Sequence, residues 1–180
     1  MTKNSTWTTF HHRGEILRNV IQTADDRRDG ILPMDVTGVP ETFDDELSLL
    51  GALQLRWHTR LAGRIEHELN AQPMDLQAAV IAAWRATAEE LPGVRLVLDH
   101  YRAEPTDDAM AAAMTKATAK EHVLLAVMAG LGSAQDPATA SVGRTVEELA
   151  RLGFAPVPRA ADHRGDPHGI FDRLMAALVA

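Results

Sequence analysis

Apolar residues at helical spacing dominate the chain, and the clearest run covers residues 42–70. Its apolar side chains recur every three or four residues, the period of one face of an α-helix. They are Phe43, Leu47, Leu50, Trp57, Leu61 and Ile65. Thr42 followed by Asp45 forms a variant of the capping box, and Asn70 with Pro73 ends the pattern. The pattern predicts one long amphipathic helix on which the other helices pack.

Five other segments repeat this period. They are residues 9–26, 75–101, 106–129 and 136–153, and a terminal helix that begins at 166. Asp136 and Asp166 are each followed by proline, the usual pairing of a capping residue with a first-turn proline. Pro92 and Gly93 interrupt the third helix while its periodicity continues in phase. We therefore expect a kink or a tight break there, without reversal of direction.

The remaining segments lack the period. We expect residues 1–8 to form a flexible arm and residues 154–165 to form a loop. Two prolines and a glycine favour a connector without a helix at residues 31–41. No alternating strand pattern occurs. The sequence predicts an all-α fold, an antiparallel bundle of about six helices in one domain over residues 1–180. The long helix is central, and the N- and C-terminal helices are accessory.

Composition narrows the class of protein. A chain of 180 residues with 46% hydrophobic content is long and apolar enough to form a core. No apolar run approaches the roughly 20 residues that span a membrane, and the N-terminus lacks a signal peptide's apolar segment. The net charge of −7 argues against a broad nucleic-acid surface, and the absence of cysteine excludes disulfides and thiolate metal sites. We expect a soluble, acidic, cytoplasmic protein without membrane or nucleic-acid partners.

Two metal-binding patterns of helical enzymes are incomplete in this sequence. Residues 25–29 read DDRRD, which resembles the DDxxD motif of all-helical isoprenoid synthases, whose carboxylates hold magnesium diphosphate. Those enzymes carry a second acidic motif that this chain lacks, so we interpret the segment as an acidic helix end. Carboxylate-bridged di-iron bundles need Glu-x-x-His pairs, and none of the eight histidines has a glutamate three residues before it.

A further group of metal-ligand residue types lies near the C-terminus. Asp162, His163, Asp166 and His168 occur within seven residues, and carboxylates with neutral imidazoles suit zinc or manganese. Asp166 is better explained as a helix cap, and loop histidines are usually solvated. We predict no metal, no cofactor and no catalytic residue, because no phosphate loop or nucleophile motif is present.

Four polar residues lie on the apolar faces of the predicted helices or next to them. Glu121 and Thr87 lie on the seams of their helices, Gln54 lies between Leu50 and Trp57 in the long helix, and His58 is one turn beyond Gln54. At about 1.5 Å of rise per residue, Glu121 and His58 lie roughly 22 and 24 Å along their helices. We expect a hydrogen-bonded pair at one level, because a buried glutamate must be paired or protonated.

This layer leaves two functional hypotheses. The first is a bundle with a regulatory or scaffold role that binds a protein partner or self-associates through a helix face, without catalysis. The second is a bundle that binds a small ligand or metal in this polar layer, and it is an enzyme if the layer is catalytic. His58 and Glu121 would form the centre of the site, and Gln54 and Thr87 would orient the ligand. Two structural explanations of the same layer are favoured over a functional one. They are an internal hydrogen-bond network that fixes helix register, and a Glu121 side chain that reaches solvent at the edge of the seam.

Overall fold

The computed structural model describes the backbone of residues 3–154 and the side chains of residues 12–154. These residues are helical without a strand, so the predicted all-α class is confirmed. The helices are α1 Lys3–Arg27, α2 Val39–Thr42, α3 Glu46–Asn70, α4 Leu76–Glu90, α5 Pro92–Ala103, α6 Asp108–Met128 and α7 Thr139–Arg151. The predicted loop beyond 154 and the terminal helix from 166 lie outside the described residues.

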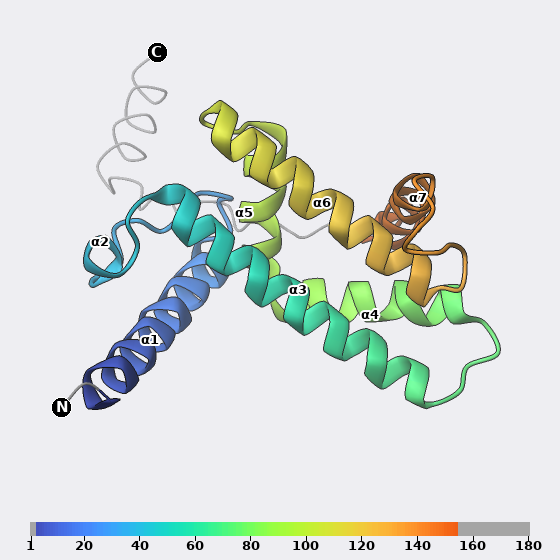
Figure 1. The fold of residues 1–180 in the computed structure, drawn as a ribbon, viewed down its shortest axis with the longest axis horizontal. Coiled ribbons are helices and arrows are strands. Elements are labelled where there is room, and N and C mark those ends of the chain that lie inside the picture. The colour runs from blue at the N-terminus through green and yellow to red at the C-terminus, as the bar shows by residue number, and fades with distance from the viewer. Residues whose placement is uncertain (1–2, 155–180) are drawn as a thin grey trace, which may run out of the picture.

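The long helix α3 is central, as predicted. It runs antiparallel to α4 and in the same general direction as α6, while α7 packs on α4 and α6 (Figure 1). On the other side, α1 packs chiefly on α5. In the described part of the chain, no helix is long and apolar enough to cross a membrane. The arrangement is a helical bundle flanked by α1 and α7.

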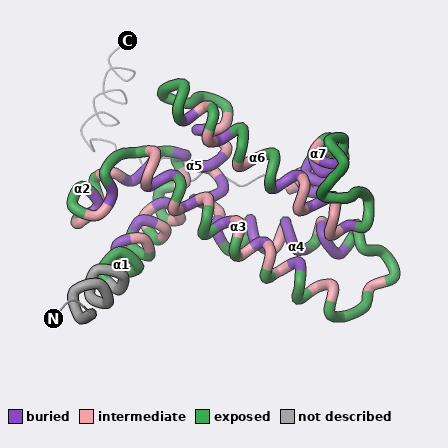
Figure 2. The backbone as a smooth tube through the Cα atoms, viewed as in Figure 1, coloured by how far each residue is buried: buried purple, intermediate pink, exposed green. Residues whose placement is uncertain are grey.

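The core lies along the inner face of α3, as the purple segments of Figure 2 show. The α3 side chains it buries are Leu49, Leu50, Leu53, Trp57, Leu61 and Ile65. Trp57 and Trp84 are fully buried, as their positions on apolar helix faces predict, and their rings meet edge to face with centroids 5.8 Å apart. Such aromatic pairs add about 0.5–1.5 kcal/mol beyond the apolar area they bury.

The start of α3 differs from the prediction. The helix begins at Glu46, and its N-cap is Asp45, whose carboxylate accepts the Ser48 N–H at 2.7 Å, so the proposed cap at Thr42 is wrong. Thr42 instead ends the short helix α2, in a connector for which the sequence predicted no helix. Pro40 is compatible with α2 because it lies in the first turn, where its missing N–H has no helical partner.

Other boundaries also shift. Helix α1 begins at Lys3, so residues 3–8, predicted to be an arm, are helical, since no glycine or proline precedes Gly14. Helix α7 begins three residues after Asp136, which caps a turn by accepting the Ala138 N–H at 2.9 Å. The expected break at Pro92 is confirmed, with only Leu91 between α4 and α5.

Candidate functional site

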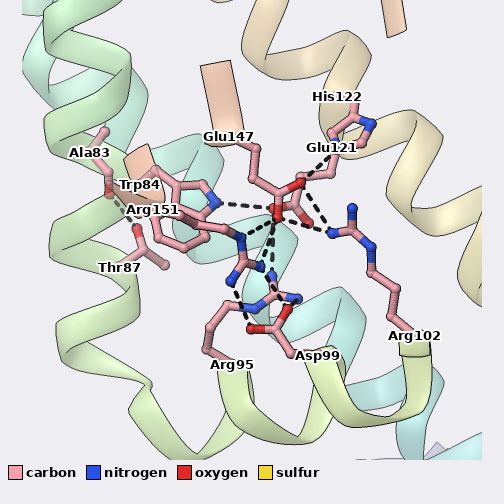
Figure 3. A network of polar contacts seen from close by, with 10 residues as sticks. All are labelled: Ala83, Trp84, Thr87, Arg95, Asp99, Arg102, Glu121, His122, Glu147 and Arg151. Carbon is pink, nitrogen blue, oxygen red and sulfur yellow. Dashed lines mark hydrogen bonds and ion pairs between the residues drawn. The ribbon is translucent and has the colours of Figure 1, made fainter. Parts of the chain in front are cut away.

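Charged and polar side chains gather inside the bundle where α4, α5, α6 and α7 meet (Figure 3). We call this group the buried network. It consists of Trp84, Arg95, Asp99, Arg102, Glu121, His122, Glu147 and Arg151. The three α5 members are spaced by four and three residues, which places them on one helix face. One face of α5 therefore presents charge to α6 and α7, and its other buried positions join the core.

Glu147 is the centre of the buried network, with a side chain only 3% exposed. Its carboxylate accepts hydrogen bonds from His122 Nε2 at 2.7 Å, from Arg102 at 3.0 and 3.1 Å, and from Arg151 at 2.8 and 3.0 Å. Burial alone raises the pKa of Glu147, but these hydrogen bonds and the two arginine charges hold it well below its ordinary value. An ionised carboxylate only accepts, so His122 carries its proton on Nε2.

Asp99 is the second acceptor in the buried network. It accepts from Arg95 at 2.7 Å and from both Arg151 terminal nitrogens at 2.6 and 3.0 Å. Burial disfavours the charge of Arg151, yet the bonds to Asp99 and Glu147 raise its pKa above the ordinary range. Arg151 also lies over the Trp84 ring, 5.0 Å from its centroid. This arginine therefore joins α5, α7 and α4.

Glu121 is buried, as its position on the α6 seam predicts, but its partners differ from the expected one. The Trp84 indole N–H donates to it at 3.3 Å, and an Arg95 terminal nitrogen lies 3.6 Å away. Arg95 is itself buried and lies over the Trp57 ring, 4.7 Å from the centroid. No hydrogen bond joins Glu121 to His58 in the described residues, so the expected pair is not formed.

The other predicted site residues lie apart from Glu121. Thr87 is buried, and its hydroxyl donates to the Ala83 carbonyl of its own helix at 2.8 Å. Gln54 and His58 are half-buried and line an open groove between α3 and α6. The similar heights of Glu121 and His58 along their helices did not predict a contact, because height does not give the direction in which each side chain leaves its helix. Ligand binding by these residues remains a prediction.

The buried network is a charge-balanced ionic cluster in which two Arg95 nitrogens, Nε and one terminal nitrogen, have no hydrogen-bond partner among the described residues. Three arginines face three carboxylates, so the charges balance while His122 is neutral. Each Glu147 oxygen already accepts hydrogen bonds from more than one donor. Among residues 12–154, no group of three or more histidines and carboxylates is arranged to hold a metal. The network therefore joins α5, α6 and α7 through paired charges.

Sequence reasoning missed most of the buried network. It placed Glu121 inside but not Arg95, His122 or Glu147. A signal existed in α5, where charged residues recur at helical spacing among buried valines and leucines. Glu147 gave no such signal, because it adjoins Val146 in a helix that is otherwise ordinary and amphipathic. Its role depends on the way in which α7 packs.

A different kind of site lies on the outer side of α3. A groove of about 440 Å³ separates α3 from α6, and one of about 570 Å³ separates α3 from α1, with a smaller hollow beside it. We call these hollows and their rims the grooved face. Its charged lining residues are Arg13, Arg18, Arg56, Lys116 and Lys120, and no Asp or Glu lines these three hollows.

The ridge between the two main grooves is formed by α3. Gly51 and Leu55 belong to both linings, and Leu55 is 66% exposed. Comparisons with known proteins find no matching family model, no similar curated protein and no similar solved structure. The buried network pairs charges between helices, whereas the grooved face is open and its charged lining residues are all basic.

Proposed function

We propose that this protein acts by docking an acidic amphipathic helix of a partner protein onto the grooved face. The observation that carries the proposal is the charge of the lining, which has five cations and no carboxylate in a chain of net charge −7. Arg56, Lys116 and Lys120 form no ion pair within the described residues. Complementary rim charges steer association and select the partner's sign.

The apolar floor of the grooves supports a helix as the occupant. Leu55 stands on the ridge, with Leu17 and Ala52 along one groove and Ala113 and Ala117 along the other. A helix laid in a groove anchors itself through apolar residues three or four positions apart and presents polar residues at the rim. Carboxylates at those flanking positions would meet the lysines and arginines of the grooved face.

Two glycines give independent support. A Cβ atom added to Gly14 or Gly51 would meet no atom within 4 Å outside its own helix backbone, so the packing of this chain requires neither glycine. Glycine inside a helix costs about 0.5–1 kcal/mol relative to alanine. Both glycines lie in the linings of the grooved face, where the absence of a side chain lets another backbone approach closely.

A second copy of this chain suits the grooved face less well. A two-fold symmetric contact would place the same patch on both subunits and bring the five cations against each other. In the buried network, arginines engage Glu147 and Asp99, which supports a structural role for these two carboxylates. We therefore propose an acidic partner helix as the occupant, and the binding experiment distinguishes it from self-association.

The test measures binding of a fluorescent 20-residue helical peptide to the purified protein by anisotropy. The peptide carries leucines at helical spacing flanked by glutamates, and its counterpart carries lysines in place of the glutamates. We expect the acidic peptide to bind and to weaken with added salt, because exposed charges are screened. Leu55→Asp should weaken binding on the order of tenfold or more, about 1.4 kcal/mol.

The matched control is Leu152→Asp, since Leu152 is also 66% exposed but lies just beyond α7. Equal weakening by both variants, or equal binding of the acidic and basic peptides, would refute the docking site. A dimer that Leu55→Asp dissociates would refute the partner choice and identify a second copy as the occupant. Light scattering of the wild type and of both variants decides this point.

A further inference from the structure

The inner face of α7 differs from those of the other helices in what it buries. Its buried residues are Thr139, Gly143, Val146, Glu147 and Ala150. Val146 is the only large apolar side chain among them, whereas α3 buries six. Glu147 and Arg151 supply the polar contacts of α7 to α5 and α6. Charged side chains therefore make up a larger share of the buried contacts of α7 than of those of α3, although Val146 and Ala150 also join the core.

We infer that α7 is a latch: a helix that detaches from α4, α5 and α6 as a unit while the rest of the bundle stays folded. The inference concerns conformational change and is independent of the proposed docking function. The inference is based on the difference between α7, which contacts α5 and α6 through ion pairs, and α3, which packs through large apolar side chains.

The energetic argument concerns the cost of opening. When an apolar helix leaves a core, its full buried area is exposed to water, at a free-energy cost that grows with that area. When an ion-pair cluster opens, each charge regains the hydration that it lost on burial, which offsets much of the lost attraction. Elements with few buried apolar contacts open with free energies below that of global unfolding. Helix α7 has this character, and α3 does not.

The chain on both sides of α7 allows such a movement. Residues 130–138 before the helix and residues 152–153 after it are exposed. The C-terminal end of α7 is held by Arg151, which bonds to Asp99, and by Arg85, which donates to the carbonyls of Leu149, Ala150 and Leu152 at 2.8–3.1 Å. Release of Arg85 and of the ion pairs frees the helix without breaking the α3–α4 core.

Release also changes the surroundings of Trp84. The Arg151 guanidinium lies over its ring, and the Phe154 ring meets it edge to face with centroids 5.9 Å apart. The Trp84 N–H bond to Glu121 lies on α4 and α6 and does not depend on α7. The open state therefore uncovers one side of a tryptophan that the closed state encloses.

The experiment is hydrogen–deuterium exchange of the full chain, read by peptide mass spectrometry for α7 (residues 139–151) and α3 (residues 46–70). In the unaltered protein we expect α7 amides to exchange at least tenfold faster than the central amides of α3, and with one common opening rate. If α7 and the centre of α3 exchange with the same protection, α7 belongs to the global unit and the latch is refuted.

Variants then identify what holds α7 closed. Glu147→Gln keeps the shape and removes the charge, so it should raise α7 exchange about tenfold further and leave α3 unchanged. Glu148→Gln is the matched control, because Glu148 is adjacent and exposed, and it should change neither helix. Val146→Ala tests the apolar contribution. If Val146→Ala opens α7 more than Glu147→Gln does, apolar packing holds the helix and the charge latch is wrong. The comparison within the unaltered chain decides the matter even if one variant fails to fold.

Discussion

The buried network and the grooved face both consist largely of charged residues, and they use charge in opposite ways. In the buried network, Asp99 and Glu147 accept hydrogen bonds from arginines at 2.6–3.1 Å, and Glu121 lies 3.6 Å from Arg95. On the grooved face, all the charged lining residues are basic, and most have no carboxylate partner. The network's charges are used within the fold, and those of the grooved face remain available to another molecule.

The difference matters for finding a functional site in a helical bundle. A buried polar cluster attracts attention because burying charge is costly and shifts pKa values. Here that cost is offset by pairing among helices, which is a structural result. The informative feature is instead the group of groove-lining cations that form no ion pair in the described residues, which includes Arg56, Lys116 and Lys120.

Breaking the buried network at Arg95 should have the largest effect on stability. Arg95→Met leaves Glu121 buried without its cation, and removal of one partner of a buried pair costs about 3–5 kcal/mol of unfolding free energy. The double variant Arg95→Met with Glu121→Leu should recover most of that loss, because an apolar pair replaces an ionic one. Urea denaturation measures both.

Arg56→Met, on the grooved face, is the matched control for that prediction. It should change the unfolding free energy by less than about 0.5 kcal/mol, because Arg56 is exposed and forms no ion pair in the described residues. The division between the two regions would not hold if the double variant lost as much stability as the sum of the losses of Arg95→Met and Glu121→Leu alone. It would also not hold if Arg56→Met lowered the unfolding free energy as much as Arg95→Met does.

A methyl group at Gly143 should give the next largest loss. A Cβ atom there would overlap the carbonyl oxygen of His122, so α6 and α7 would have to move apart. Overpacking of this kind costs about 1–3 kcal/mol, and a backbone neighbour that cannot rotate away favours the upper end. Thermal unfolding of Gly143→Ala measures this loss of stability. An unchanged unfolding midpoint would show that α6 and α7 can move apart at little cost.

Acid should weaken the buried network through Glu147. Its folded pKa is below its ordinary value of 4.5, so the stability it contributes is present above pH 4.5 and is lost as pH falls toward the folded value. One such group gives a slope of up to about 1.4 kcal/mol per pH unit below 4.5. Denaturation at stepwise lower pH should show a smaller slope for Glu147→Gln, and equal slopes would mean that Glu147 is not the group responsible.

The sequence predicted the parts of this molecule that depend on local pattern. Helical spacing located α3 and the burial of Trp57, Trp84 and Glu121, because period and side-chain type decide which face turns inward. It missed the α2 helix at Pro40 and the true cap of α3, since proline and aspartate allow several local structures. Boundaries of this kind are set by a few weak hydrogen bonds.

The candidate site was harder to predict because it depends on long-range packing. His58 was expected beside Glu121 from its height along the helix, but its direction places it in the α3–α6 groove. Asp99 of α5 and Arg151 of α7 bond to each other although they are 52 residues apart in sequence. No single-helix pattern contains that information. The sequence analysis also missed the grooved face. Its basic residues come from α1, α3 and α6, and only the fold shows that no carboxylate lines the same hollows.

The smallest stability effect is also the sharpest test of the grooved face. Gly51→Ala and Gly63→Ala both place a methyl where no atom lies within 4 Å, so each should stabilise α3 by about 0.5–1 kcal/mol. Gly51 lines both main grooves and Gly63 lines neither. If the space above Gly51 receives a partner helix, Gly51→Ala should weaken binding of the acidic peptide while Gly63→Ala leaves it unchanged. Equal stability gains with equal peptide affinity would show that the glycine at 51 has no role in docking.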